Sequence, residues 1–458
     1  MTQSACVNAD MPRQRSSGLV RVDRVPSRVA LPAPSYDLHR TTLGNGLRVL
    51  LAPDRSVPVT AVAVFYDVGM RSEPEGRTGF AHLFEHLMFQ GSAHLEKLAH
   101  FRYVQASGGI FNGSTHIDYT NYFEVLPSNA LERALFLEAD RMESPRITED
   151  NLANQLSVVK EEIRVNVLNR PYGGFPWLVL PPVMFDTFPN AHNGYGEFGD
   201  LEAATVEDAA AFFDRYYAPA NALLCVAGDI DIDGTIELVD KYFGPIPTRD
   251  KPPVRTFAEP DLTGERRGSV VDKHAPLPAV AAAWRVPDPV TELSAYLPYL
   301  VLSEVLTDGD ASRLEQRLVR DDRTVTQVGS YLGLMGDPFD VADPTMLLIQ
   351  AIQTEDSTAE QVLTATQDEL ARLAADGPGT GELDRVKARI VATMVHGVDS
   401  VLGRALQLSA LEQRHGRAEL ISELPGLIGA VTDEEVRAVA ATLRPERRAV
   451  VELRPGKD

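Results

Sequence analysis

The chain has 458 residues, 44% of them hydrophobic and 24% charged, which is typical of a globular protein too long for one ordinary domain. Its 65 acidic and 44 basic residues give a formal net charge of −21, which excludes a nucleic-acid binder that neutralises phosphates. A solvated acidic surface explains this charge, and an acidic cavity that prefers basic substrates is the alternative.

The beginning of the chain, residues 1–38, is rich in arginine and serine, and we expect a disordered extension there. A transit peptide is the alternative, which Asp10 and Asp23 disfavour. The two cysteines, Cys6 and Cys225, fit no disulfide or metal pattern, and no run of eighteen apolar residues occurs. We therefore expect a cytoplasmic protein without a membrane partner.

The first predicted domain covers residues 39–246, and order is expected to begin near Leu43. Its expected elements are strands over 43–50, 57–68, 123–125 and 222–228, and helices over 128–143 and 149–168. A Gly- and Asn-rich segment, residues 108–122, precedes the third strand. Strands that alternate with helices predict an α/β domain.

The second predicted domain, residues 269–458, follows a linker over 247–268 that is dense in Pro, Arg, Asp and Gly. The segment around Pro58 is echoed by that around Pro278, and the segment around Pro219 is echoed by that around Pro445. The two offsets are nearly equal, which indicates a duplicated α/β domain, with chance similarity of patterns as the alternative.

The most informative stretch is His82-Leu83-Phe84-Glu85-His86. Two histidines four apart lie on one face of a helix, where both imidazoles can bind one zinc ion. Glu85 lies near that face and can transfer protons instead of binding the metal. The pattern H-x-x-E-H is the inverted form of the zincin motif. The equivalent part of the second domain, residues 302–306, has no histidine.

A hydrolytic zinc site needs a third protein ligand and an open position. In the predicted helix over 149–168, an apolar stripe recurs at helical spacing. Glu162 flanks that stripe, whereas Glu161 lies nearly opposite to it and should face solvent. The helical geometry therefore favours Glu162 as the third ligand. The remaining histidines with no comparable spacing are expected not to bind metal: His94, His100, His116 and His192.

Several stretches of the chain resemble the pitrilysin/insulinase family of zinc peptidases, especially half-length members such as the subunits of mitochondrial processing peptidase. The matching stretches are Leu43–Leu47, Val68-Gly69 with Glu73, Thr78–Gly91, Gly108-Gly109 with Asn112, Val158–Glu162, Pro171–Gly173 and Ser312–Leu314. The resemblance extends over residues 40–455. It implies an α+β fold of two tandem homologous α/β domains, each with a mostly antiparallel sheet packed with helices.

The resemblance also implies a zinc site and a place for the substrate. In the family, a glutamate at a set distance downstream of the second histidine completes the zinc site, and that distance from His86 again gives Glu162. His82, His86 and Glu162 would hold Zn²⁺, and Glu85 would act as the general base. Residues 108–122 resemble a strand to which an extended peptide adds, with Asn112, Gly113 and Ser114 as candidate contacts. A Gly-rich turn with local side-chain bonds is the alternative for these three residues.

Two positions depart from the family pattern. Gln155 stands where members often have a glutamate that supports the metal site, and an amide can still orient a ligand. Self-sufficient members have an Arg and a Tyr seven residues apart in the second domain. Arg320 matches the Arg, but Gln327 stands at the Tyr position, and Tyr331 lies four residues too late. The missing tyrosine suggests a heterodimer with a homologous zinc-free subunit that supplies the Arg/Tyr pair, and a homodimer is the alternative.

The sequence thus predicts a zinc endopeptidase that cleaves peptides or leader segments inside a chamber closed by two chains. A non-catalytic scaffold or binding subunit is the alternative from another functional class, and the intact set of four site residues argues against it. A peptidase that matures ribosomally made peptide products stays open.

Overall fold

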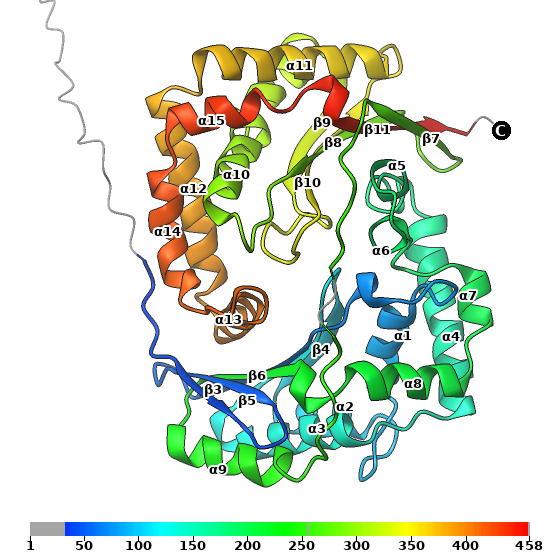
Figure 1. Cartoon of the computed structure of the whole chain (residues 1–458), viewed down its shortest axis with the longest axis vertical. Helices are drawn as coiled ribbons and strands as arrows, with labels where there is room; N and C mark the ends of the chain where they lie inside the picture. Colours follow the sequence, from blue (N-terminus) through cyan, green and yellow to red (C-terminus); the bar gives the residue numbers. More distant parts are fainter. Residues whose placement is uncertain (1–32, 254–255, 457–458) are drawn as a thin grey trace, which may run out of the picture.

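Two β-sheets, with helices packed against them, form the part of the protein that the computed structural model describes, residues 33–253 and 256–456 (Figure 1). The predicted extension over 1–38 lies mostly outside the described residues. Residues 33–38 have no regular secondary structure, and Tyr36 and Leu38 pack against the core. No helix of the described part is long and apolar enough to cross a membrane.

The first half of the chain contains a six-stranded sheet and nine α-helices among the described residues. Its strands are β1 (His39–Thr42), β2 (Arg48–Pro53), β3 (Val59–Tyr66), β4 (Ile110–Thr115), β5 (Thr120–Pro127) and β6 (Ala222–Gly228). Its helices are α1 (Phe80–Leu87), α2 (Ala99–Ala106), α3 (Leu131–Glu143), α4 (Glu149–Ile163), α5 (Pro181–Met184), α6 (Phe188–Ala191), α7 (Phe198–Glu202), α8 (Val206–Tyr216) and α9 (Ile232–Phe243). A π-helical turn (Arg164–Leu168) continues α4.

The second half of the chain contains a five-stranded sheet. Its strands are β7 (Arg266–Asp272), β8 (Ala279–Val286), β9 (Val325–Leu332), β10 (Thr345–Gln353) and β11 (Arg448–Pro455). Its helices are α10 (Leu293–Thr307), α11 (Ala359–Asp376), α12 (Thr380–Gly397), α13 (Val401–His415), α14 (Leu420–Ala430) and α15 (Asp433–Ala440). A π-helical segment (Glu315–Asp321) precedes β9.

The two sheets have the same topology. The first is ordered β1-β2-β6-β3-β5-β4 and the second β7-β11-β8-β10-β9. Each sheet has one parallel pair, β2 with β6 and β7 with β11, and its other neighbours are antiparallel. The predicted duplication and the mostly antiparallel sheets are therefore confirmed, and β1 is an extra strand that was not predicted.

Each half covers a face of the other half's sheet. Helix α13 of the second half packs on β3 and β6, and the core at that face contains residues of both halves. In return, α5 of the first half packs on β7 and β11 (Figure 1). Leu180 and Met184 belong there to the same buried core as Ala281 and Met346 of the second half. Apolar side chains that would face water in a separated half are thus buried by the other.

Most predicted elements are present, but the predicted strand over 43–50 begins later, as β2 at Arg48, because residues 43–47 form the turn that joins it to β1. Ordered structure also begins before Leu43, since β1 starts at His39. The predicted helix over 149–168 is α4 with its π-helical continuation, and the predicted strand over 222–228 is β6. The predicted linker ends earlier than expected, because β7 begins at Arg266 and pairs with β11 from that residue. The first sheet has two edge strands, β1 and β4, and β4 pairs only with β5 among the strands of this sheet.

Candidate metal centre

Helix α1 carries the H-x-x-E-H motif and is held by its buried face. Phe80, Leu83, Phe84 and Leu87 are all buried in the core of the first half. At its start, Gly79 has a φ of +84°, and a Cβ there would lie 2.8 Å from the Cα atom of Gly196. Both the positive φ and this close approach require glycine.

Helix α4 lies beside α1 (Figure 1). Its Glu162 side chain lies next to His82 and His86 of α1. Thr148 caps α4 by accepting a hydrogen bond from the Asn151 amide, and Val159 and Ile163 are buried on the stripe that the sequence indicates. Glu161, one position earlier, points outward and pairs with Arg164 at 3.1 Å. The structure brings Glu162, and not Glu161, to the two histidines.

Three side-chain atoms that could bind one metal ion converge between these helices. The Nε2 atoms of His82 and His86 lie 3.3 Å apart, and Glu162 Oε2 lies 3.7 Å from the first and 3.4 Å from the second. Ligands at about 2.0–2.1 Å around a tetrahedral zinc ion are about 3.3–3.4 Å from one another. The spacing of the three atoms therefore fits a zinc ion.

The electrostatics of the three side chains favour a cation. Burial, and then the charge of His86, lower the pKa of His82 to about 4, so its imidazole is neutral at pH 7. The hydrogen bond with His86 holds the pKa of Glu162 below its usual value. A neutral imidazole and a carboxylate both direct lone pairs into the gap, and a divalent cation would satisfy them.

Glu85 lies next to this group but does not belong to it. Its Oε2 atom accepts a hydrogen bond from Thr115 Oγ1 at 2.8 Å. Burial raises the pKa of Glu85, while the Thr115 hydrogen bond and the charge of His86 oppose the shift. A carboxylate with a raised pKa is a stronger base than an ordinary carboxylate, which suits a group that takes up a proton.

The remaining predicted site residues lie in different places. Asn112, Gly113 and Ser114 lie on the edge strand β4, and a Cβ on Gly113 would be 3.2 Å from Glu85 Cγ. Gln155 is buried, and its side chain donates to Asn154 Oδ1 at 2.8 Å, with no described hydrogen bond to His82, His86 or Glu162.

Arg320, the residue expected to help at the active site, lies in the second half of the chain. It forms exposed ion pairs with Asp310 and Glu315 at 3.5 and 3.6 Å. Gln327 and Tyr331 lie on β9, where the Tyr331 ring contacts Trp177 edge-on. None of the described contacts connects these residues to the three convergent ligand atoms.

The roles of three residues near the site were missed by sequence reasoning. Thr115 bonds Glu85, Glu73 bonds the backbone at the start of α1, and the Tyr195 ring packs edge-on against His82 at 5.6 Å. These residues lie outside the H-x-x-E-H motif and follow no recurring spacing. Only the three-dimensional arrangement identifies what they do.

A second group of possible ligands is buried and consists of His100 on α2, Glu124 on β5 and Glu138 on α3. Arg141 already pairs with Glu138, and its Nε donates to Glu138 Oε2 at 2.9 Å. Burial raises the pKa of both carboxyl groups, that of Glu138 to about 8. Arg141 pairs with Glu138, and His100 Nε2 lies 2.6 Å from Glu124 Oε1, so both carboxyl groups already have partners. We therefore assign this cluster to the core and not to a second metal site.

The fold and the convergent ligand set define a duplicated α+β protein with an inverted zincin motif in its first half. Residues 48–171 match the family model described as Insulinase (Peptidase family M16), and residues 203–390 match that described as Peptidase M16 inactive domain. The chain belongs to the M16 peptidase family.

Relatives and solved structures agree with this assignment. The zinc protease PqqE of Helicobacter pylori is 30% identical over 396 residues, which cover 84% of this chain and 86% of that protein. The beta subunit of the mitochondrial-processing peptidase of Lentinula edodes is 21% identical, over 87% of this chain and 86% of its own length. The crystal structure of a protease from Helicobacter pylori has a TM-score of 0.84 at 27% identity, and the match covers 92% of this chain and all of that one.

Proposed function

We propose that this protein is a zinc-dependent endopeptidase that hydrolyses peptides or leader segments. The observation that carries the proposal is the convergence of His82, His86 and Glu162, with ligand atoms 3.3–3.7 Å apart, beside the buried carboxyl group of Glu85. The names of the zinc protease relatives support the same activity.

His82, His86 and Glu162 would hold the ion in this site. When bound, zinc lowers the pKa of water and polarises a carbonyl group. Glu85 takes a proton from the attacking water and delivers it to the leaving amine. Thr115 holds one oxygen of Glu85, which leaves the other oxygen free for that transfer.

The edge strand β4 supplies the place for the peptide. An extended substrate adds to this edge by backbone hydrogen bonds along Asn112, Gly113 and Ser114. A cavity of about 410 Å³ adjoins Asn112 and is lined largely by apolar side chains, among them Phe89, Phe101 and Phe111. This cavity would accept an apolar side chain of the substrate.

A second subunit would complete the enzyme. Two observations support a heterodimer with a homologous zinc-free chain. No described contact joins Arg320 to His82, His86 or Glu162, and Gln327 stands in place of the family's tyrosine. A homodimer is the alternative, and two chains would close a chamber in either case. The cytoplasmic location stays a prediction from the sequence.

The test combines metal analysis with cleavage of a quenched fluorescent peptide by the purified chain, alone and after addition of candidate subunits. We expect one zinc ion per chain and activity that Glu85→Gln abolishes without loss of zinc. A chain that binds no zinc would instead support the scaffold function. Size-exclusion chromatography that gave a fully active homodimer would reject the heterodimer.

A further inference from the structure

The turn between β4 and β5, residues 116–119, is embedded in the second half of the protein. His116 Nδ1 lies 2.5 Å from Asp340 Oδ2, and Tyr119 Oη donates to Asp340 Oδ1 at 2.9 Å. The rings of His116 and Tyr119 stack with centroids 4.2 Å apart. One carboxylate of the second half therefore holds two side chains of this turn.

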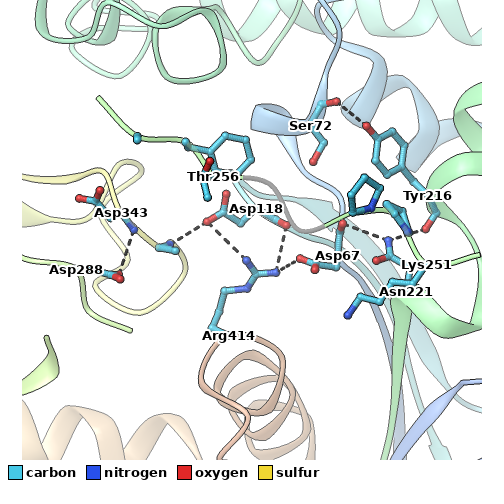
Figure 2. A pocket seen from close by; sticks show the side chains of 15 residues that line it. Asp67, Ser72, Asp118, Tyr216, Asn221, Lys251, Thr256, Asp288, Asp343 and Arg414 are labelled. Carbon is cyan, nitrogen blue, oxygen red and sulfur yellow. Dashed lines mark hydrogen bonds and ion pairs between the residues drawn. The ribbon is translucent and has the colours of Figure 1, made fainter. Parts of the chain in front are cut away.

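Asp118, in the same turn, adds a buried ionic contact. Arg71 Nε donates a hydrogen bond to Asp118 Oδ1 at 2.7 Å, and the Ala342 amide donates one to Asp118 Oδ2 at 2.9 Å. Arg414, at the end of α13, reaches both Asp118 and Asp67 (Figure 2). Burial raises the pKa of Asp118, but the guanidinium groups of Arg71 and Arg414 lower it more, so it lies below its usual value. The turn is thus fixed to both the 340–342 loop and α13.

The strand that enters this turn reaches the candidate catalytic carboxylate. Thr115, the last residue of β4, immediately precedes His116 and donates to Glu85 Oε2 at 2.8 Å. Among the residues that the structure describes, this is the one side-chain hydrogen bond to Glu85. The strand also lies close to Glu85 at Gly113, so a shift of β4 would move or release the carboxylate.

A continuous set of contacts therefore connects the second half to Glu85. Ser114 adds to it, because its Oγ lies 2.9 Å from His116 Nε2 and donates to Asn121 Oδ1 at 2.7 Å across the β4–β5 pair. A charge-assisted bond such as that between His116 and Asp340 is among the stronger hydrogen bonds in proteins. A general base loses efficiency when it is misplaced by as little as about 1 Å.

We propose that Thr115 is a positioning residue for Glu85, and that Asp340 of the second half, acting through His116, holds Thr115 in place. This inference rests on the proposed peptidase function. It gives the half without metal ligands a part in the chemistry: the second half fixes the hairpin that orients the general base.

The first test compares Thr115→Val, which keeps the shape and removes the donor, with Thr115→Ser, which keeps the donor. We expect Thr115→Val to lower kcat by about 10- to 100-fold with KM and zinc content unchanged. Thr115→Ser should stay within about threefold of the wild type, because a hydroxyl in that position can still donate. Thermal midpoints are measured first, and Thr115→Ala replaces a valine variant that does not fold.

The second test separates the contact of Asp340 from any other contact between the halves. Asp340→Asn should lower kcat by about 3- to 10-fold, which corresponds to the usual size of coupling between connected sites. It should also speed hydrogen exchange of the amides in residues 113–119. The matched control is Asp54→Asn, which removes an ion pair between the halves with Arg404, away from the hairpin. This control should change neither quantity.

Each outcome decides the proposal. A wild-type kcat in Thr115→Val overturns the role of Thr115, and equal behaviour of Asp340→Asn and Asp54→Asn overturns the role of the second half. If the wild-type chain, loaded with zinc and supplied with its subunit, cleaves no peptide, the proposed function itself fails. If the wild type cleaves and the variants cleave equally well, only this inference fails.

Discussion

His192 Nε2 lies 3.0 Å from Glu73 Oε2, behind the start of the helix that carries the metal motif. The two oxygens of Glu73 also accept the backbone amides of Gly79 and Ala81, at 2.8 Å each. A carboxylate at a helix N-terminus satisfies free amides and interacts favourably with the helix dipole. Burial lowers the pKa of His192, but the hydrogen bond and charge of Glu73 raise it more, so it lies above its usual value. This pair fixes α1, and with it His82 and His86, relative to α6.

Glu73→Gln removes the charge from this pair and leaves one oxygen for three donors. We expect the free energy of unfolding to fall by about 1.5–3 kcal/mol, because the lost bonds are buried and charge-assisted. Zinc affinity should weaken as well, since the helix that carries His82 and His86 loses its cap. Urea unfolding and a zinc-chelator competition measure the two effects. The control is the exposed neighbour Glu75, whose glutamine variant should match the wild type.

Glu161 and Glu162 form a matched pair on one helix, because only Glu162 reaches the histidines. Glu162→Ala should weaken zinc binding by more than about 100-fold, since even residues behind metal ligands contribute about 10- to 100-fold. Glu161→Ala should leave the affinity unchanged. Metal affinity can be measured by competition with a fluorescent chelator. Equal affinity of the two variants would refute the assignment of Glu162.

The carboxyl pair of Glu124 and Glu138 predicts a dependence of stability on pH. The pKa of Glu138 is raised from 4.5 to about 8, first by burial, so the folded state keeps a proton that the unfolded state releases. The resulting stability is fully present below about pH 4.5 and is lost as the pH rises through about 8. Wild-type protein should therefore be less stable at pH 9 than at pH 6.

Glu124→Gln should reduce this loss, because it removes a neighbouring carboxyl group whose negative charge helps to raise the pKa of Glu138. The measurement is the free energy of unfolding at pH 6 and pH 9, with Glu143→Gln, at an exposed position on the helix of Glu138, as control. A loss of stability in Glu124→Gln as large as that of the wild type and the control would show that this pair does not titrate in the window.

Phe101 and Tyr103, both on α2, form a matched pair for testing the apolar cavity as a substrate site. Both aromatic side chains are partly exposed, at 43% and 48%, but only Phe101 lines the cavity beside Asn112. Phe101→Ala should lower the preference for an aromatic over an alanine side chain in the substrate by about 10-fold. Tyr103→Ala should not. The ratio of kcat/KM for paired peptides is the readout, and an unchanged ratio for Phe101→Ala would place the substrate elsewhere.

The periodic features of this fold could be predicted from the sequence. The offset from Pro58 to Pro278 carries β3 (Val59–Tyr66) onto β8 (Ala279–Val286). The offset from Pro219 to Pro445 carries the start of β6 onto the start of β11. The helical phase that favours Glu162 over Glu161 corresponds to the observed positions of both side chains. Helical periodicity and repeated strands are local patterns, and local patterns are visible in one sequence.

The contacts between distant segments could not be predicted. His116 and Asp340 are 224 residues apart, and neither belongs to a motif or a recurring spacing. The strand β1 was missed because only four residues pair, and its alternation of exposed and half-buried side chains gives little apolar signal. The hydrogen bond from the Gln155 side chain to Asn154 also depends on side-chain packing, which no periodic pattern in the sequence predicts.

Each half of the protein buries an apolar sheet face of the other half, and these buried faces hold the two halves together. Because α13 packs on the first sheet and α5 packs on the second, the halves are joined by these contacts and do not depend on the linker peptide. A cut in the linker near residues 251–253 would give two fragments that remain bound to each other through these buried faces. Either half expressed alone would expose an apolar sheet face and would aggregate. The duplication has thus produced one inseparable body from two copies of the same domain.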